Sequence, residues 1–168
     1  MTKIGLLSDT HGYLHEKLYT FFSDCHEIWH AGDIGNKETA DSLAAIKPLR
    51  AVYGNIDGHE LRCIYKEKLW FECEQQKIFM THIGGYPGRY YPEIRKLLHK
   101  NRPDIFICGH SHILKVIYDN EYKLLHINPG AAGIQGMQLV STAIRFTIDG
   151  NEVKEMEILE IPRKKVIH

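Results

Sequence analysis

The sequence predicts an α/β (α+β) protein built from two packed, mixed β-sheets with helices on their outer faces. Two observations carry this prediction. In the first two thirds of the chain, short apolar runs alternate with polar loops and amphipathic segments, an order that favours a largely parallel sheet. In the last third, apolar runs are separated only by turns, which favours antiparallel pairing. Two sheets with outer helices bury the apolar faces of both kinds of segment.

The N-terminal half is predicted to alternate three strands with two helices. Leu14, Leu18, Phe21 and Phe22 recur at helical spacing, which gives the first helix one apolar face. Asn36 is a suitable N-cap for the second helix, and Pro48 ends it. The predicted strands are 3–8, 28–30 and 49–53, and the predicted helices are 13–23 and 36–47.

The C-terminal half begins with an ambiguous segment, 61–71, which mixes aromatic, β-branched and charged residues and is predicted to be irregular or a hairpin. Asp149-Gly150 is a hairpin signal between the last two apolar runs. The segment 163–165 is expected to be a solvated tail. The predicted strands are 77–81, 105–108, 115–118, 122–127, 144–148 and 153–161, and the predicted helix is 91–100.

Size and composition narrow the class of protein. The 168 residues suit a single domain over 1–168, large enough for a substantial core. Lys plus Arg and Asp plus Glu both number 21, so we expect neither nucleic-acid nor membrane binding. No apolar run reaches the length of a signal peptide or a membrane span, so a cytoplasmic protein is expected. The four cysteines show no metal or redox spacing and are expected to be reduced and mostly buried.

Seven polar residues lie just after five different apolar runs, at the ends of predicted strands. Metal ligands are expected at such positions. Asp9 and His11 are two residues apart, and His110 and His112 repeat that spacing. Carboxylate, amide and imidazole together suit transition-metal ions. If these residues had only structural roles, their presence after all five apolar runs would be a coincidence at each run. The seven candidate ligands are Asp9, His11, Asp33, Asn55, His82, His110 and His112.

Asp33, which lies between Gly32 and Gly35, is predicted to bridge two ions. The two oxygens of one carboxylate can each bind an ion and hold the pair about 3.5 to 4 Å apart, as two-metal hydrolases require. Two divalent ions would lower the pKa of a shared water and so generate hydroxide near neutral pH. Manganese is the expected metal, with iron, zinc and nickel as alternatives.

The ordered blocks Asp9-Thr10-His11, Gly32-Asp33, Gly54-Asn55, His82 and Gly109-His110-Ser111-His112 resemble the calcineurin-like metallophosphoesterase superfamily. Chain length and Asn128-Pro129-Gly130 are most similar to its short YfcE-type phosphodiesterase branch, which also resembles the metallophosphoesterase-fold subunit of retromer. The resemblance implies a four-layer αββα sandwich. It also implies that Asp9, His11 and His112 hold one metal, that Asn55, His82 and His110 hold the other, and that Asp33 bridges.

One departure from this family concerns the general acid. Larger members carry histidine after the motif asparagine, whereas this chain has Ile56, which cannot transfer a proton. His59 or His11 are candidate replacements, and Asp57 is a candidate catalytic acid that could instead cap its turn or orient a ligand. Without such an acid, we expect slow turnover or substrates with good leaving groups.

Together with the resemblance, the sequence therefore predicts a metal-dependent phosphoric ester hydrolase acting on a small phosphoester, with a diester as the leading interpretation. A metal-bridging hydroxide is expected to attack phosphorus in line. The alternatives are a phosphomonoesterase and a non-catalytic scaffold that presents a protein-binding surface. The physiological substrate stays open, and so does the oligomeric state, with a homo-oligomer among the alternatives.

Several other polar residues have structural interpretations that are as good as functional ones. His30 could support the site or simply pack in its strand. Asn128 could form a turn with Pro129 or support the ligands. Arg89 is a candidate substrate contact beside the His82 loop.

Overall fold

The computed structural model describes residues 1–164, which form two mixed five-stranded sheets. The first sheet has the order β10-β9-β1-β2-β3. Within it β1, β2 and β3 are parallel, while β9 pairs antiparallel with both β1 and β10. Its strands are β1 (Thr2–Leu7), β2 (Glu27–His30), β3 (Leu49–Ala51), β9 (Val140–Asp149) and β10 (Glu152–Pro162).

The second sheet has the order β4-β5-β6-β8-β7. β5, β6 and β8 are parallel, and the two edge strands, β4 and β7, are antiparallel to their neighbours. Its strands are β4 (Lys68–Cys73), β5 (Gln76–Thr81), β6 (Ile105–Ile107), β7 (Leu114–Asp119) and β8 (Leu124–Pro129).

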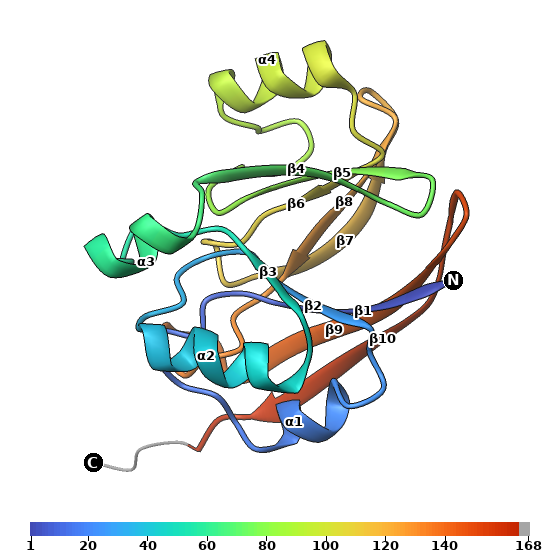
Figure 1. Cartoon of the computed structure of the whole chain (residues 1–168). Helices are drawn as coiled ribbons and strands as arrows, with labels where there is room; N and C mark the ends of the chain where they lie inside the picture. The colour runs from blue at the N-terminus through green and yellow to red at the C-terminus, as the bar shows by residue number, and fades with distance from the viewer. Residues whose placement is uncertain (165–168) are drawn as a thin grey trace.

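Helices cover the outer faces of both sheets, which confirms the predicted αββα sandwich (Figure 1). α4 (Pro92–Asn101) lies on the second sheet, and α1 (Lys17–Phe21) and α2 (Lys37–Ile46) lie on the first. α3 (His59–Ile64) lies at the end of the two sheets toward which the N-terminal strand runs (Figure 1). The candidate site is at this end.

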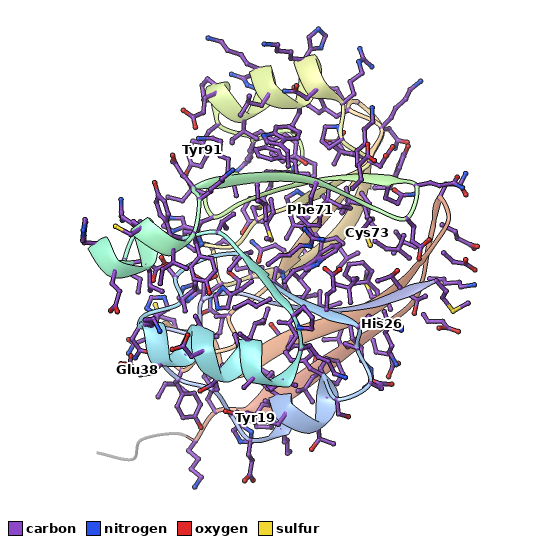
Figure 2. The ribbon with its side chains drawn as sticks, in the orientation of Figure 1. Tyr19, His26, Glu38, Phe71, Cys73 and Tyr91 are labelled. Atoms are coloured by element: carbon purple, nitrogen blue, oxygen red, sulfur yellow. The ribbon has the colours of Figure 1, made fainter. Side chains whose placement is uncertain are left out.

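The main core lies between the sheets, where side chains from both fill the space (Figure 2). Alternation along β1 explains the layering, since Ile4 and Leu6 point into this core while Leu7 points outward under α1 and α2. Trp29 stacks edge-on against Phe71 across the sheets, with ring centroids 4.9 Å apart. Under α4, Ile94 and Leu98 pack on the outer face of the second sheet.

Three helix boundaries follow from local chemistry that the sequence shows. The side chain of Asn36 accepts hydrogen bonds from Thr39 N at 2.9 Å and Thr39 Oγ1 at 2.7 Å, so the predicted N-cap of α2 is confirmed. α4 begins at Pro92, whose fixed φ suits the first helical turn. It ends at Asn101, and the C-cap residue Arg102 has the left-handed conformation.

Three predicted elements need correction. The helix expected over 13–23 is only Lys17–Phe21. The residues before it form tight turns, with i→i+3 hydrogen bonds such as Leu18 N to His15 O. The segment 61–71, expected to be irregular or a hairpin, contains most of α3 and the start of β4; only Leu61 of α3 is buried, so no helical period was visible. β8, expected in an antiparallel region, also pairs parallel with β6.

The predicted solvated tail is wrong for Arg163, which is half-buried and donates from Nε to Ser141 Oγ at 3.0 Å. Lys164 is exposed, and Lys165 lies outside the described residues. Three cysteines are buried and Cys63 is exposed, all as free thiols, as expected. None of the helices in the described part of the chain has the length and apolar character needed to cross a bilayer.

Candidate metal centre

All seven predicted ligands lie in loops just after strands, and the parallel strands bring these loops together at one end of the sandwich. Asp9 and His11 follow β1, Asp33 follows β2 and Asn55 follows β3. His82 follows β5, and His110 and His112 follow β6 in the second sheet. Because the carboxyl ends of parallel strands share one edge, residues more than 100 positions apart meet there.

Asp9, His11 and His112 form the first group, with one ligand atom of each within 4.8 Å of the others. Asp9 Oδ1 lies 3.1 Å from His112 Nε2 and 3.8 Å from His11 Nε2. The other oxygen, Oδ2, accepts hydrogen bonds from Ser8 Oγ at 2.6 Å and His110 N at 3.1 Å. Asp9 is therefore anchored through one oxygen and presents the other to the group.

Asp33, His82 and His110 form the second group, by the same criterion. Asn55 Oδ1 lies 3.0 Å from His110 Nδ1, which adds the amide oxygen to this group. Asp33 Oδ2 lies 3.1 Å from His82 Nε2 and 3.5 Å from His11 Nε2 of the first group. Asp33 therefore lies between the two groups, where a bridging carboxylate is expected.

Three buried atoms at the centre have no hydrogen-bond partner among the described residues: Asp9 Oδ1, His11 Nε2 and His82 Nε2. Leaving buried polar atoms unpaired costs about 1–3 kcal/mol each. His82 Nδ1 lies 2.8 Å from Ala31 O, so that nitrogen donates and Nε2 faces Asp33 Oδ2 at 3.1 Å. Once Nε2 has lost its proton, its lone pair would face a carboxylate oxygen, and a cation fits between two such ligands.

The charges around the two carboxylates also favour a bound cation. Burial raises the pKa of Asp9, but His112, whose Nε2 lies 3.1 Å from Oδ1, and the facing His82 ring outweigh burial and leave this pKa lowered. Burial likewise opposes ionisation of Asp33, and His82 and the Ile56 N–H lower its pKa. Both carboxylates are therefore held ionised by positive charge at the centre, which divalent ions would supply more strongly.

Five of the seven ligand residues have a left-handed backbone, with φ between 46° and 72°. This conformation is uncommon for residues with a Cβ, and its cost persists only where the surroundings enforce it. It turns each side chain off its strand axis toward the centre. The residues are Asp9, His11, Asp33, His110 and His112.

Asp57 ties the loops after β2 and β3 together. Its carboxylate accepts from Ile34 N at 3.1 Å, Gly35 N at 2.8 Å and Gly54 N at 2.8 Å, and only 2% of the residue is exposed. These contacts account for both oxygens. They support the orienting interpretation of Asp57 and leave no free carboxylate oxygen for acid catalysis.

His30 links the loops after β1 and β2. Its Nδ1 accepts from Gly32 N at 3.0 Å, so Nε2 carries the proton and donates to Thr10 Oγ1 at 2.9 Å; Thr10 in turn donates to Ile34 O. Complete burial lowers the pKa of His30 to about 4, which keeps the ring neutral. His30 therefore both packs in its strand and supports the Asp33 loop.

The His110–His112 loop is held by Asn128 and by the close approach of Gly109. Asn128 Nδ2 donates to Gly109 O at 3.1 Å and Ser111 Oγ at 3.0 Å, while its Oδ1 accepts from Gly130 N in a turn. A Cβ on Gly109 would lie 2.1 Å from Ser8 Oγ and 2.8 Å from Asp9 Oδ2. Only glycine lets this loop pack against Asp9.

A groove of about 730 Å³ opens beside the second group and is lined by the ligands Asn55 and His82. Ile83, Tyr91 and Ile94 form its apolar wall, and Figure 2 labels Tyr91 at the beginning of α4. The groove also contains Arg62, which sequence reasoning missed because α3 was not predicted. It is large enough for one organic half of a small phosphoester.

Two predicted site residues lie away from the groups and the groove. His59 is exposed on α3 with its Nε2 3.4 Å from Cys63 Sγ, and it joins neither ligand group nor the described groove lining. Arg89 is exposed and does not line the groove. His11 lies at the centre, and its side chain is 19% exposed.

Comparison with known proteins places this geometry in a family. A probable metallophosphoesterase of Methanocaldococcus jannaschii is 32% identical, covering 94% of this chain and 82% of that protein. A phosphodiesterase of the same organism is 30% identical, covering 76% and 82%. The crystal structure of Entamoeba histolytica Vps29 complexed with zinc superposes with a TM-score of 0.73 at 17% identity, covering 95% and 98%. Residues 2–151 match the model of the calcineurin-like phosphoesterase superfamily domain, and the chain belongs to that superfamily.

Proposed function

We propose that this protein is a two-metal phosphodiesterase that hydrolyses small phosphodiesters. The observation that carries the proposal is the convergence of two ligand groups on Asp33, with Asp9 Oδ1, His11 Nε2 and His82 Nε2 buried and unpartnered at the centre. The phosphodiesterase relative from Methanocaldococcus jannaschii supports the choice of a diester.

In this proposal Asp9, His11 and His112 hold one ion, Asn55, His82 and His110 hold the other, and Asp33 contacts both. Manganese is the proposed metal. Bound divalent ions supply Lewis acidity, which lowers the pKa of water and neutralises charge on the phosphoryl oxygens. The buried carboxylates would hold the ions in place, because each is anchored through one oxygen: Asp9 by Ser8 and His110, and Asp33 by the Ile56 N–H at 3.0 Å.

The groove supports a diester over a monoester. A diester carries a second organic group that needs a wall to pack against, and Ile83, Tyr91 and Ile94 provide an apolar one next to Asn55 and His82. Ile56 is 46% exposed beside Asn55 and offers no proton to the leaving oxygen. Alcohols that leave readily as anions are therefore the favoured leaving groups.

The experiment is hydrolysis of bis(p-nitrophenyl) phosphate and p-nitrophenyl phosphate by manganese-loaded protein, with metal content measured in parallel. We expect faster turnover of the diester. Asp33→Asn should abolish this turnover while the circular dichroism spectrum stays unchanged. Metal-loaded protein that hydrolyses neither ester would refute the enzyme proposal and favour a scaffold, and faster hydrolysis of the monoester would refute the diester preference.

A further inference from the structure

Arg62 presents a fixed positive charge in the groove. Its Nε donates to Asp57 O at 2.6 Å and its Nη2 donates to Asn55 O at 3.3 Å. The guanidinium carbon lies 4.7 Å from the centre of the Tyr53 ring, a cation–π contact. These three contacts hold a long side chain in one orientation, although the residue itself is exposed.

The two carbonyl groups that hold Arg62 belong to the residues on either side of Ile56. The guanidinium therefore lies alongside the loop position where a proton-transferring side chain is missing. Asn55, the ligand on one side of this position, lines the same groove as Arg62. The charge is thus next to the second ligand group and faces the space proposed for the substrate.

Arg62 also retains hydrogen-bonding capacity. Its Nη1 makes no hydrogen bond to any described residue, so both N–H donors of Nη1 remain for a ligand. Arg62 is the one lysine or arginine among the described residues that line the groove; the two other charged lining residues, Glu67 and Glu93, are acidic. Among the described lining residues, Arg62 is therefore the lysine or arginine side chain that an anionic oxygen in this groove can approach.

We propose that Arg62 stabilises the negative charge that develops on the leaving oxygen during diester hydrolysis. In this step a water molecule that has released one proton to solvent forms a bond from its oxygen to phosphorus, and the bond from phosphorus to the leaving oxygen breaks, with its electron pair moving to that oxygen. Arg62 donates hydrogen bonds from Nη1 to this oxygen and keeps its own protons; the departing anion later takes a proton from water. The inference rests on the proposed phosphodiesterase function.

This role predicts that Arg62 matters more as the leaving group becomes worse. The anion of a weakly acidic alcohol is unstable, whereas the anion of an acidic phenol is stable on its own. A donor that stabilises negative charge on the leaving oxygen therefore contributes most for the weakly acidic alcohol. A residue that only positions Asn55, or that contacts the transferred phosphoryl group, would affect all leaving groups by the same factor.

The test measures kcat/KM for a series of methyl aryl phosphates whose phenols differ in acidity, using manganese-loaded wild type, Arg62→Ala and Arg62→Lys. Arg95→Ala, an exposed arginine of α4 outside the groove lining, is the matched control. We expect Arg62→Ala to lower kcat/KM by about 10²- to 10³-fold for the least acidic phenol and by roughly tenfold or less for p-nitrophenol. Added guanidinium ion should restore part of the loss.

Metal content and thermal midpoint are measured for every variant. A uniform loss across the series, or a loss that follows lower metal content, would assign Arg62 to the support of Asn55 and overturn the leaving-group role. Arg62→Lys should retain part of the selectivity because it keeps the charge without the planar fork. Absence of turnover by metal-loaded wild type would refute the proposed function, and the role of Arg62 with it; unaltered selectivity in an active Arg62→Ala would refute the role alone.

Discussion

Asp57→Asn should weaken both the fold and the metal centre, because one carboxylate holds two of its loops. In the wild type Oδ2 accepts from Ile34 N and Gly54 N, and Oδ1 accepts from Gly35 N. Asparagine has a single acceptor oxygen, so its amide group must face at least one of these N–H donors. Hydrogen bonds to a charged group contribute about 1.5–3 kcal/mol each, and an unpaired buried donor adds its desolvation cost.

We therefore expect Asp57→Asn to lower the free energy of unfolding of metal-free protein by about 2–4 kcal/mol. For a chain of this size that corresponds to a fall of roughly 5–15 °C in the thermal midpoint. Manganese affinity should fall as well, since Asp33 and Asn55 lie in the loops that Asp57 joins. Chemical denaturation gives the first quantity and isothermal titration of metal-free protein with manganese gives the second.

Asp41→Asn is the matched control, because Asp41 is exposed and pairs with Lys37 on the surface of α2 at 2.7 Å. Such a pair contributes about 0.3–0.5 kcal/mol, so the control should be almost neutral. If Asp57→Asn were as stable as Asp41→Asn and bound manganese with wild-type affinity, the loops would not depend on this carboxylate and the reasoning would fail.

Three further predictions follow from particular contacts. Gly109→Ala should reduce the number of manganese ions bound, since its Cβ would displace Ser8 Oγ and Asp9; atomic absorption measures this, and two bound ions would contradict it. Burial lowers the pKa of His126 to about 4, so protonation of this ring opposes the fold. The free energy of unfolding should be at its full value above about pH 6.5 and fall toward pH 4, and the fall should be smaller in His126→Phe. Urea denaturation across this pH range measures both. Arg163→Ala should lower the thermal midpoint by roughly 2–4 °C through loss of its bond to Ser141, whereas Lys164→Ala should not; equal midpoints would restore the solvated-tail interpretation.

That the candidate metal ligands lie together could be predicted because each comes just after an apolar run. A parallel strand places the next residues at a known edge of the sheet, so Asp9, Asp33 and His82 could be assigned to one location without knowing any distance. The same rule brought Asn55, His110 and His112 to that edge. Strand ends are thus a strong signal, and the alternation of apolar residues located the two-sheet core.

Contacts between loops could not be predicted in this way. His59 and Arg62 lie in one short helix with a single buried residue. Apolar residues therefore show no helical periodicity there that could predict the helix or the side chain that faces the groove. His59 turned toward Cys63, while Arg62 turned toward the carbonyls of Asn55 and Asp57. Arg163 lies beyond the last strand and looked like a solvated tail because its partners, Ser141 and the Gln135 carbonyl, are distant in sequence.

The central claim is that Asp33 joins two ion sites that act together on a phosphodiester. The most direct test titrates metal-free protein with manganese and measures, at each point, the ions bound per chain and the rate of bis(p-nitrophenyl) phosphate hydrolysis. We expect two ions per chain, with the rate rising as the second site fills. Full activity at one ion per chain, or no activity at two, would contradict the claim.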